Sequence, residues 1–158
     1  MSRRMRRRIH ISTGSVFFDV LPLLAIPMLY YNFVVFAGFA GSTPAAIAAW
    51  MIAPTITIPM FSGAVLSLSV SDIILFASMP LLFFEIVKSA RSDALSVMNH
   101  IVSTLTLLIG TIEFVAVQGF STAVFCLIVI MQLVDVIAGF TVTIAAARRG
   151  MGGSTVVG

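Results

Sequence analysis

Charged side chains are scarce in this sequence. Asp, Glu, Lys and Arg together make up 9% of the 158 residues, whereas 59% of the residues are hydrophobic. Soluble domains are about one quarter charged, so the composition excludes an ordinary soluble domain and indicates a membrane protein. The length allows one domain, residues 1–149, followed by a glycine-rich tail at 150–158 that we expect to be flexible.

Cysteine is nearly absent, and so are the patterns that carry metals or cofactors. The single cysteine, Cys126, excludes an internal disulfide and a thiolate metal site. Neither His10 nor His100 has a second metal ligand at helical spacing, and no phosphate loop, dinucleotide fingerprint, serine elbow or zinc-protease motif occurs. No nucleophile–base pair is visible. We therefore expect no enzymatic activity, no cofactor and no metal.

Lys and Arg are missing between the first and second apolar blocks and between the third and fourth. They occur before the first block, between the second and third at Lys88 and Arg91, and after the last at Arg148 and Arg149. Short loops that carry Lys and Arg stay cytoplasmic, so the alternation predicts four spans with both termini in the cytoplasm.

The predicted fold class is an all-α membrane protein, a four-transmembrane-helix bundle with a short extracytoplasmic β-hairpin, and the expected location is a bacterial inner membrane. The expected spans are about residues 16–40, 72–88, 97–117 and 122–147.

Five arginines form a cluster ahead of the first span: Arg3, Arg4, Arg6, Arg7 and Arg8. We expect this cluster to contact anionic lipid headgroups, with each charge contributing about 1 kcal/mol, and we expect no nucleic-acid partner. The apolar stretch that follows is longer than the hydrophobic region of a signal peptide, so we expect it to remain as an anchor helix. Pro22 and Pro27 should kink it.

The segment 41–71 combines apolar residues with breaks that argue against one long helix. A short helix is expected at 45–52, with Trp50 at headgroup level. Beyond it, residues 55–58 and 65–71 alternate between apolar and polar on either side of Ser62 and Gly63, a pattern typical of a β-hairpin. An open hairpin edge cannot lie in lipid, so we place it on the outer surface, packed on the bundle ends or on a partner. With the hairpin in place, the second span begins at Asp72, which we expect to act as its N-cap. The alternative is a second span that begins near Ala64.

Small and polar residues recur along one face of each of the last two spans. On the third span they are Asn99, Ser103, Thr106, Gly110 and Glu113, and on the fourth they are Gln132, Asp135, Gly139 and Thr143. Steps of three and four residues place each set on one side of a helix. Both faces should point into the bundle, where small residues allow close approach and polar side chains bond across the seam. A tight outer turn at 118–121 makes the two spans antiparallel and sets Asp135 opposite Thr106.

The depth of each carboxylate suggests its role. Glu85 should lie near the cytoplasmic face in an interfacial ion pair with Lys88. Asp135 falls near the midplane, whereas Glu113 and Asn32 fall in one layer near the outer surface. An ionised carboxylate without a partner at these depths costs at least about 2.5 kcal/mol. Glu113 and Asp135 are therefore hydrogen-bonded packing residues, or contacts to a partner chain, or parts of an ion or proton path.

These features favour a non-enzymatic membrane subunit that self-assembles or joins a larger membrane complex. The expected partners are the lipid bilayer and either copies of the chain or another membrane protein. The alternative is a small proton- or cation-conducting channel or transporter that uses Glu113 and Asp135 at subunit seams. A membrane-embedded enzyme is the weakest of the three hypotheses.

Overall fold

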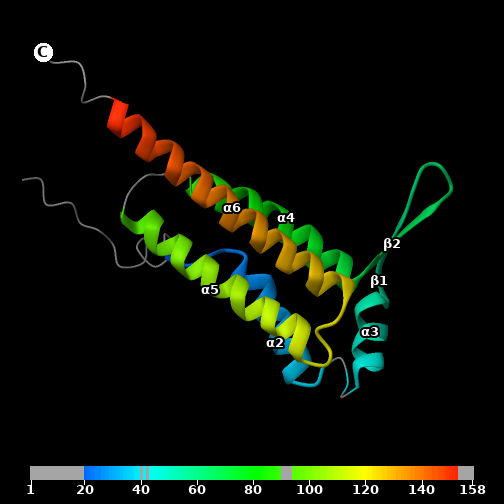
Figure 1. Cartoon of the computed structure of the whole chain (residues 1–158). Helices are drawn as coiled ribbons and strands as arrows, with labels where there is room; N and C mark the ends of the chain where they lie inside the picture. Colours follow the sequence, from blue (N-terminus) through cyan, green and yellow to red (C-terminus); the bar gives the residue numbers. More distant parts are fainter. Residues whose placement is uncertain (1–19, 40, 42, 90–93, 153–158) are drawn as a thin grey trace, which may run out of the picture.

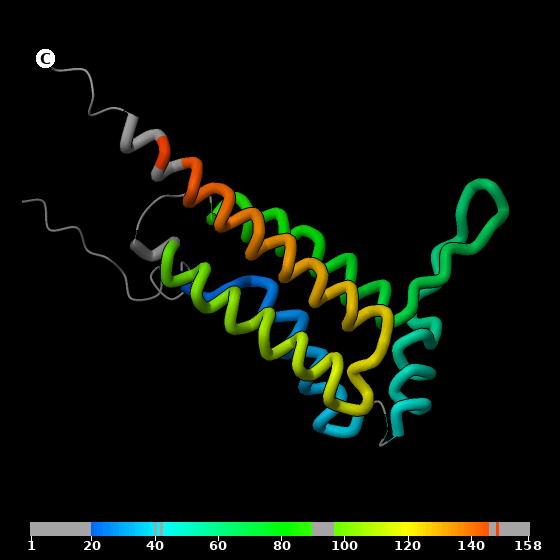
Figure 2. The backbone as a smooth tube through the Cα atoms, viewed as in Figure 1, coloured from blue at the N-terminus to red at the C-terminus, as the bar shows by residue number. Residues whose placement is uncertain are grey.

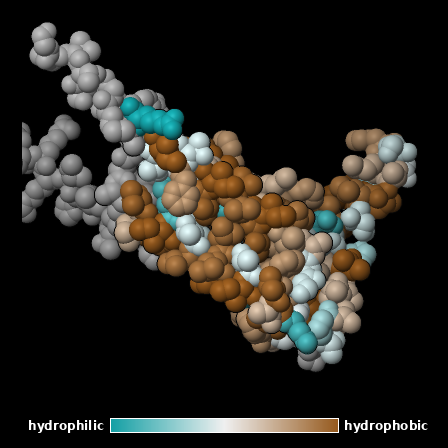
Figure 3. All heavy atoms as spheres, in the orientation of Figure 1, coloured by the Kyte–Doolittle hydropathy of each residue, from teal (hydrophilic) through white to brown (hydrophobic). Residues whose placement is uncertain are grey.

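Three long helices dominate the structure, a computed structural model that describes residues 20–39, 41, 43–89 and 94–152 (Figure 1). They are α4 (Val70–Ser89), α5 (Ala94–Ala116) and α6 (Ala123–Gly152), and each is long and apolar enough to cross a membrane. Only 17%, 22% and 39% of the residues in their most apolar windows are buried within the chain. Figure 3 shows hydrophobic side chains over the sides of the bundle. Such a surface indicates an integral membrane protein.

The helices are arranged with α6 packed along both α4 and α5 (Figures 1 and 2). A fourth helix, α2 (Ala25–Phe36), contacts all three. The tight turn predicted at 118–121 is confirmed: α5 and α6 are joined by a short connection in which Gly119 has φ +97°. We call the end of the bundle with this turn the hairpin end and the opposite end, where α6 terminates, the tail end.

The first predicted span is interrupted in the structure. Helix α2 has 12 residues, and at about 1.5 Å per residue it is roughly 18 Å long, too short to cross about 30 Å of hydrocarbon alone. Residues 21–24 are not helical. Pro27 lacks an N–H and its ring clashes with the carbonyl four residues before it, at Leu23, so the helix begins only at Ala25. The break lies where Pro22 and Pro27 were expected to kink the first span, but it is a full interruption of the helix rather than a kink. Residues 16–19 and 40 of that span lie outside the described residues.

The hairpin predicted from alternation is confirmed. Strands β1 (Pro54–Pro59) and β2 (Val65–Ser69) pair antiparallel, and their connection is closed by a hydrogen bond from Met60 N to Ala64 O at 2.8 Å, with Gly63 at φ +82°. The alternative of a second span from Ala64 is wrong. Before the hairpin lies α3 (Pro44–Ile52), capped by the Thr43 hydroxyl, which accepts from Ala46 N at 3.2 Å.

The hairpin projects away from the bundle across the direction of the long helices (Figures 1 and 2). All residues of β1 and the first three of β2 are exposed. The expectation that it packs on the bundle ends is therefore wrong within the described residues, and packing on a partner stays a prediction. Within these residues β1 and β2 form a two-stranded sheet that no third strand joins.

The start of α4 corrects the role given to Asp72. Ser69, not Asp72, is the N-cap: its hydroxyl accepts from Asp72 N at 3.3 Å, and the Asp72 carboxylate accepts from Ser69 N at 2.8 Å. This reciprocal pair is a capping box with Asp72 at the third helical position. The box lets the helix begin at Val70, so α4 has 20 residues, slightly more than the predicted span 72–88.

At the other end of the chain α6 continues through Gly152, beyond the predicted limit at 147 and into the segment expected to be flexible.

An apolar core fills the hairpin half of the bundle. Its centre consists of Met28, Tyr31, Phe120, Phe125 and Ile128, all buried. The Tyr31 hydroxyl donates to Gly119 O at 3.0 Å and is hydrogen-bonded to Thr122 Oγ1 at 2.7 Å. The core therefore ties α2 to the turn between α5 and α6.

Candidate functional site

Glu85 is the centre of a buried polar cluster in the tail half of the bundle. Its carboxylate is fully buried and accepts three contacts: Leu23 N at 2.7 Å, Asn99 Nδ2 at 2.7 Å and Lys88 Nζ at 3.0 Å. Lys88 Nζ also donates to Leu21 O at 2.8 Å. Glu85 and Lys88 thus bind the backbone that the break before α2 leaves outside a helix, as membrane proteins require of interrupted helices.

This arrangement confirms the Glu85–Lys88 ion pair. Glu85 is also buried inside the bundle, where it contacts Leu23 and Asn99. The sequence carried one usable signal, because Pro22 and Pro27 predicted disrupted backbone at the same depth as Glu85.

Asp135 lies on α6 beside this cluster and is 2% exposed. The Ser103 hydroxyl of α5 faces its carboxyl group near enough to interact, but no hydrogen bond of acceptable geometry joins them. The hydroxyl expected opposite Asp135 was that of Thr106, which instead donates to Val102 O at 2.8 Å in its own helix. Threonine commonly bonds to the preceding helical turn in this way. Asp135 therefore has a hydroxyl neighbour, though a different one from that predicted.

Gln132 lies one helical turn from Asp135 and binds the other side of the broken segment. Its Nε2 donates to Leu24 O at 3.3 Å and contacts Met28 Sδ at 3.3 Å. Its Oε1 lies 3.5 Å from the position that a Cβ atom would take at Gly110. The predicted small residue thus permits the close approach of α5 to α2 and α6 at this level.

His100 of α5 packs against Gly139 of α6 near the tail end. The imidazole ring is 6% exposed and fills the space where a Cβ atom at Gly139 would stand. The ring also packs 6.3 Å from the ring of Phe140, measured between centroids. Gly139 therefore accommodates a buried histidine, which the sequence pattern did not identify.

Glu113 and Asn32 are brought together near the hairpin end, in the common layer expected from their depths. Asn32 Nδ2 donates to Glu113 Oε2 at 3.0 Å and to Met28 O at 3.1 Å. Both side chains are half-buried. Glu113 is bonded to Asn32 on α2, whereas Asp135 faces Ser103 on α5, so the two acids belong to separate sites.

The remaining predicted residues divide by burial. Ser103, Gly110 and Gly139 are buried, as their helical spacing predicts. Thr143 is exposed, and its hydroxyl donates to Gly139 O at 3.0 Å within α6. The headgroup contacts predicted for the arginine cluster lie outside the described residues.

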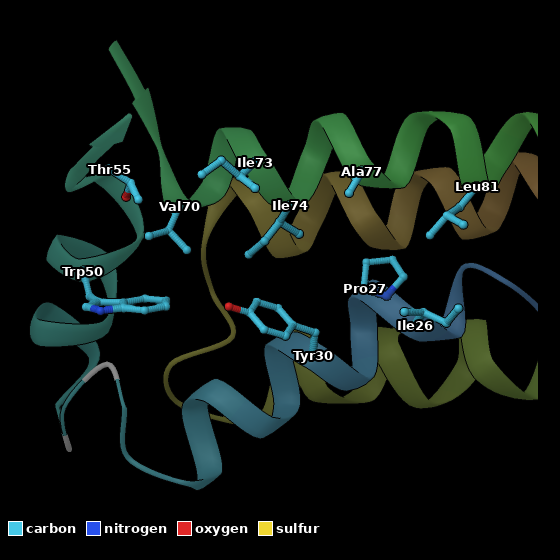
Figure 4. Close-up of a pocket in the computed structure, with 10 residues that line it drawn as sticks. All are labelled: Ile26, Pro27, Tyr30, Trp50, Thr55, Val70, Ile73, Ile74, Ala77 and Leu81. Atoms are coloured by element: carbon cyan, nitrogen blue, oxygen red, sulfur yellow. The ribbon is translucent and has the colours of Figure 1, made fainter. Parts of the chain in front are cut away.

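An apolar groove opens between α2, α3 and α4, with a volume of about 440 Å³ (Figure 4). Trp50 and Tyr30 approach it from α3 and α2, opposite Ile74 and Leu81 of α4. Its walls are almost entirely hydrocarbon and ring surface, suited to an acyl chain or an apolar side chain rather than to catalysis.

Within the described residues no group of three or more His, Cys, Asp or Glu side chains could hold a metal ion. Comparison with protein-family models, with curated proteins and with solved structures gave no match.

Proposed function

We propose that this chain is a non-enzymatic membrane subunit that assembles, with copies of itself or with a larger membrane complex, through its projecting hairpin. In this proposal four segments lie in the membrane, both termini are cytoplasmic, and the hairpin is on the outer side. The segment around α2 then enters the bilayer as a broken helix held by α4 and α6. The support is one observation: the hairpin has an apolar face that is largely exposed in the part of the chain that the structure describes.

The register of the hairpin defines that face. Ile56 pairs with Leu68 and Ile58 with Leu66, so these four side chains lie on one side of the sheet. The next pair, Thr57 and Ser67, lies on the other side.

No charged residue occurs between positions 54 and 69, and Phe61 at the tip is completely exposed. Isolated two-stranded hairpins are marginally stable in water, and soluble edges are normally protected by charge. A partner that packs on the hairpin would stabilise the two strands and protect their edges.

Matched substitutions on the two faces test this proposal. Ile58→Asn with Leu66→Asn places two amides on the apolar face, whereas Thr57→Asn with Ser67→Asn places two on the hydroxyl face of the same strands. Native mass spectrometry in mild detergent should show an oligomer for the parent and the control, and a monomer for the apolar-face variant. A parent that is monomeric at every concentration, or two variants that behave alike, would refute assembly through this face.

Conduction of protons or cations is the second candidate function, supported by the buried Asp135 carboxyl and its polar neighbours. Glu113 is bonded to Asn32, and Asp135 faces Ser103, so the two carboxyl groups share no contact and a path between them would have to use a seam between subunits. Asp135→Asn and Glu113→Gln should then abolish flux in liposomes without loss of folding. Flux absent from the parent protein would eliminate this candidate.

A further inference from the structure

Four buried polar atoms have no hydrogen-bond partner within the described part of the chain. They are Asn99 Oδ1, Ser103 Oγ, Gln132 Oε1 and Asp135 Oδ1, on side chains that are 1–3% exposed. An unpaired buried polar atom costs about 1–3 kcal/mol, so four of them would offset much of the stability of a small protein. The two amide oxygens can only accept hydrogen bonds, so whatever satisfies them must donate.

These atoms follow one another along the seam between α5 and α6. Gln132 Oε1 lies beside Gly110 near the middle of the bundle, and Asp135 faces Ser103 about one turn nearer the tail end. Asn99 follows one further turn along α5 and is bonded to Glu85. The four unpaired atoms therefore lie in a row along the seam, which we call the file, rather than around one point.

The two ends of the file differ in exposure. At the tail end it reaches Glu85 and then Lys88, whose side chain is 15% exposed. Toward the hairpin end it meets the apolar core, where Tyr31, Phe125 and Ile128 are each 0% exposed. Apolar, fully packed regions of this kind exclude water.

We propose that this file holds water molecules and that Asp135 exchanges protons through it with the tail-end side of the membrane only. Buried waters typically bind two to four otherwise unsatisfied polar groups, and each water supplies the two donors that the amide oxygens lack. A hydronium ion gives its proton to the Asp135 carboxylate and remains as water, and the reverse transfer releases the proton. The site needs no through-going path, so it stands whether or not the protein conducts ions or assembles through its hairpin.

The groups that face Asp135 fit this role. Glu85 and Lys88 approach it from α4, Ser103 from α5, and His100 lies one turn further along the seam. Glu85 pairs with Lys88 at 3.0 Å and accepts two further hydrogen bonds, so both of its carboxylate oxygens have partners. Asp135 is the carboxyl group of this seam that has an oxygen without a partner in the described residues.

Infrared difference spectroscopy of the protein in liposomes tests the proposal. The C=O stretch of the protonated Asp135 carboxyl group is identified as the band lost in Asp135→Asn and shifted in Asp135→Glu. The sidedness of the liposomes is established by labelling Arg148→Cys in a Cys126→Ser background with an impermeant reagent. We expect the band to respond to a pH change, and to deuterium, on the tail-end side alone.

Ser103 and Glu113 provide the matched comparisons. Ser103→Val should slow proton exchange at Asp135 about tenfold, the rate equivalent of one lost hydrogen bond, and Ser103→Thr should restore it. Glu113→Gln should leave the Asp135 band unchanged, because Glu113 is bonded to Asn32 and not to a member of the file. A band that responds from the hairpin end, or from neither side, would overturn the proposal, and the parent protein alone can give that result if a variant fails to fold.

Discussion

Replacing Glu85 by glutamine should be among the most destabilising single changes in this protein. The substitution keeps the volume of the side chain but turns one acceptor oxygen into an amide donor. If the amide oxygen faces Asn99 and Lys88, the amide nitrogen faces Leu23 N; if it is rotated, the nitrogen faces the other two donors. Either orientation leaves at least one buried donor without an acceptor.

The magnitude follows from this geometry. Removing one partner of a buried ion pair costs about 3–5 kcal/mol, because the remaining charge is left uncompensated. That is a large fraction of the 5–15 kcal/mol typical of a whole domain. We therefore expect Glu85→Gln to lower the free energy of unfolding by about 3–5 kcal/mol, measured by denaturation in mixed detergent micelles.

Glu113→Gln is the control, because an amide oxygen can still accept the hydrogen bond from Asn32 Nδ2 and the expected loss is below about 1 kcal/mol. The double variant Glu85→Gln with Lys88→Met should cost less than the sum of its single changes, since it also removes the uncompensated ammonium group. If Glu85→Gln matched Glu113→Gln within about 0.5 kcal/mol, the argument that Glu85 holds the broken helix would fail.

Three further changes probe other contacts through the free energy of unfolding. Gly139→Ala should cost about 1–3 kcal/mol because the new methyl group overlaps the His100 ring, and the loss should shrink when His100 is also alanine. Tyr31→Phe removes the hydroxyl that binds the turn between α5 and α6, so we expect a loss of about 1–2 kcal/mol with helix content unchanged by circular dichroism. Ser69→Ala removes the N-cap of α4 and should cost about 1 kcal/mol, whereas Ser69→Asp should restore most of it; equal losses in the two variants would refute the capping box with Asp72.

Patterns that repeat over many residues predicted the fold well. Alternation at 55–58 and 65–71 identified the hairpin, and steps of three and four residues placed Asn99, Ser103, Gly110, Gln132 and Asp135 inside the bundle. Each is a local regularity, because the direction of a side chain repeats with the period of its own element.

Contacts between distant segments could not be predicted from such local patterns. Nothing near Glu85 in the sequence reveals that its carboxylate meets Leu23 N, which is 62 residues away. The side chain facing Asp135 was misassigned by one turn because a threonine hydroxyl has the choice of bonding to its own helix, as Thr106 does. Asp72 was misread for a related reason: a capping box and a simple cap share the same residues, and only the geometry separates them.

The junction between β2 and α4 contains no connecting residue, because the strand ends at Ser69 and the helix begins at Val70. No loop separates the strand from the helix, and Ser71 Oγ is bonded to Met51 O at 2.9 Å, so the hairpin, α3 and the start of α4 form one connected unit. The opposite end of α4 carries Glu85 and Lys88, which bind the interrupted segment at residues 21–24. One helix therefore links the projecting hairpin directly to the contacts that hold the broken helix.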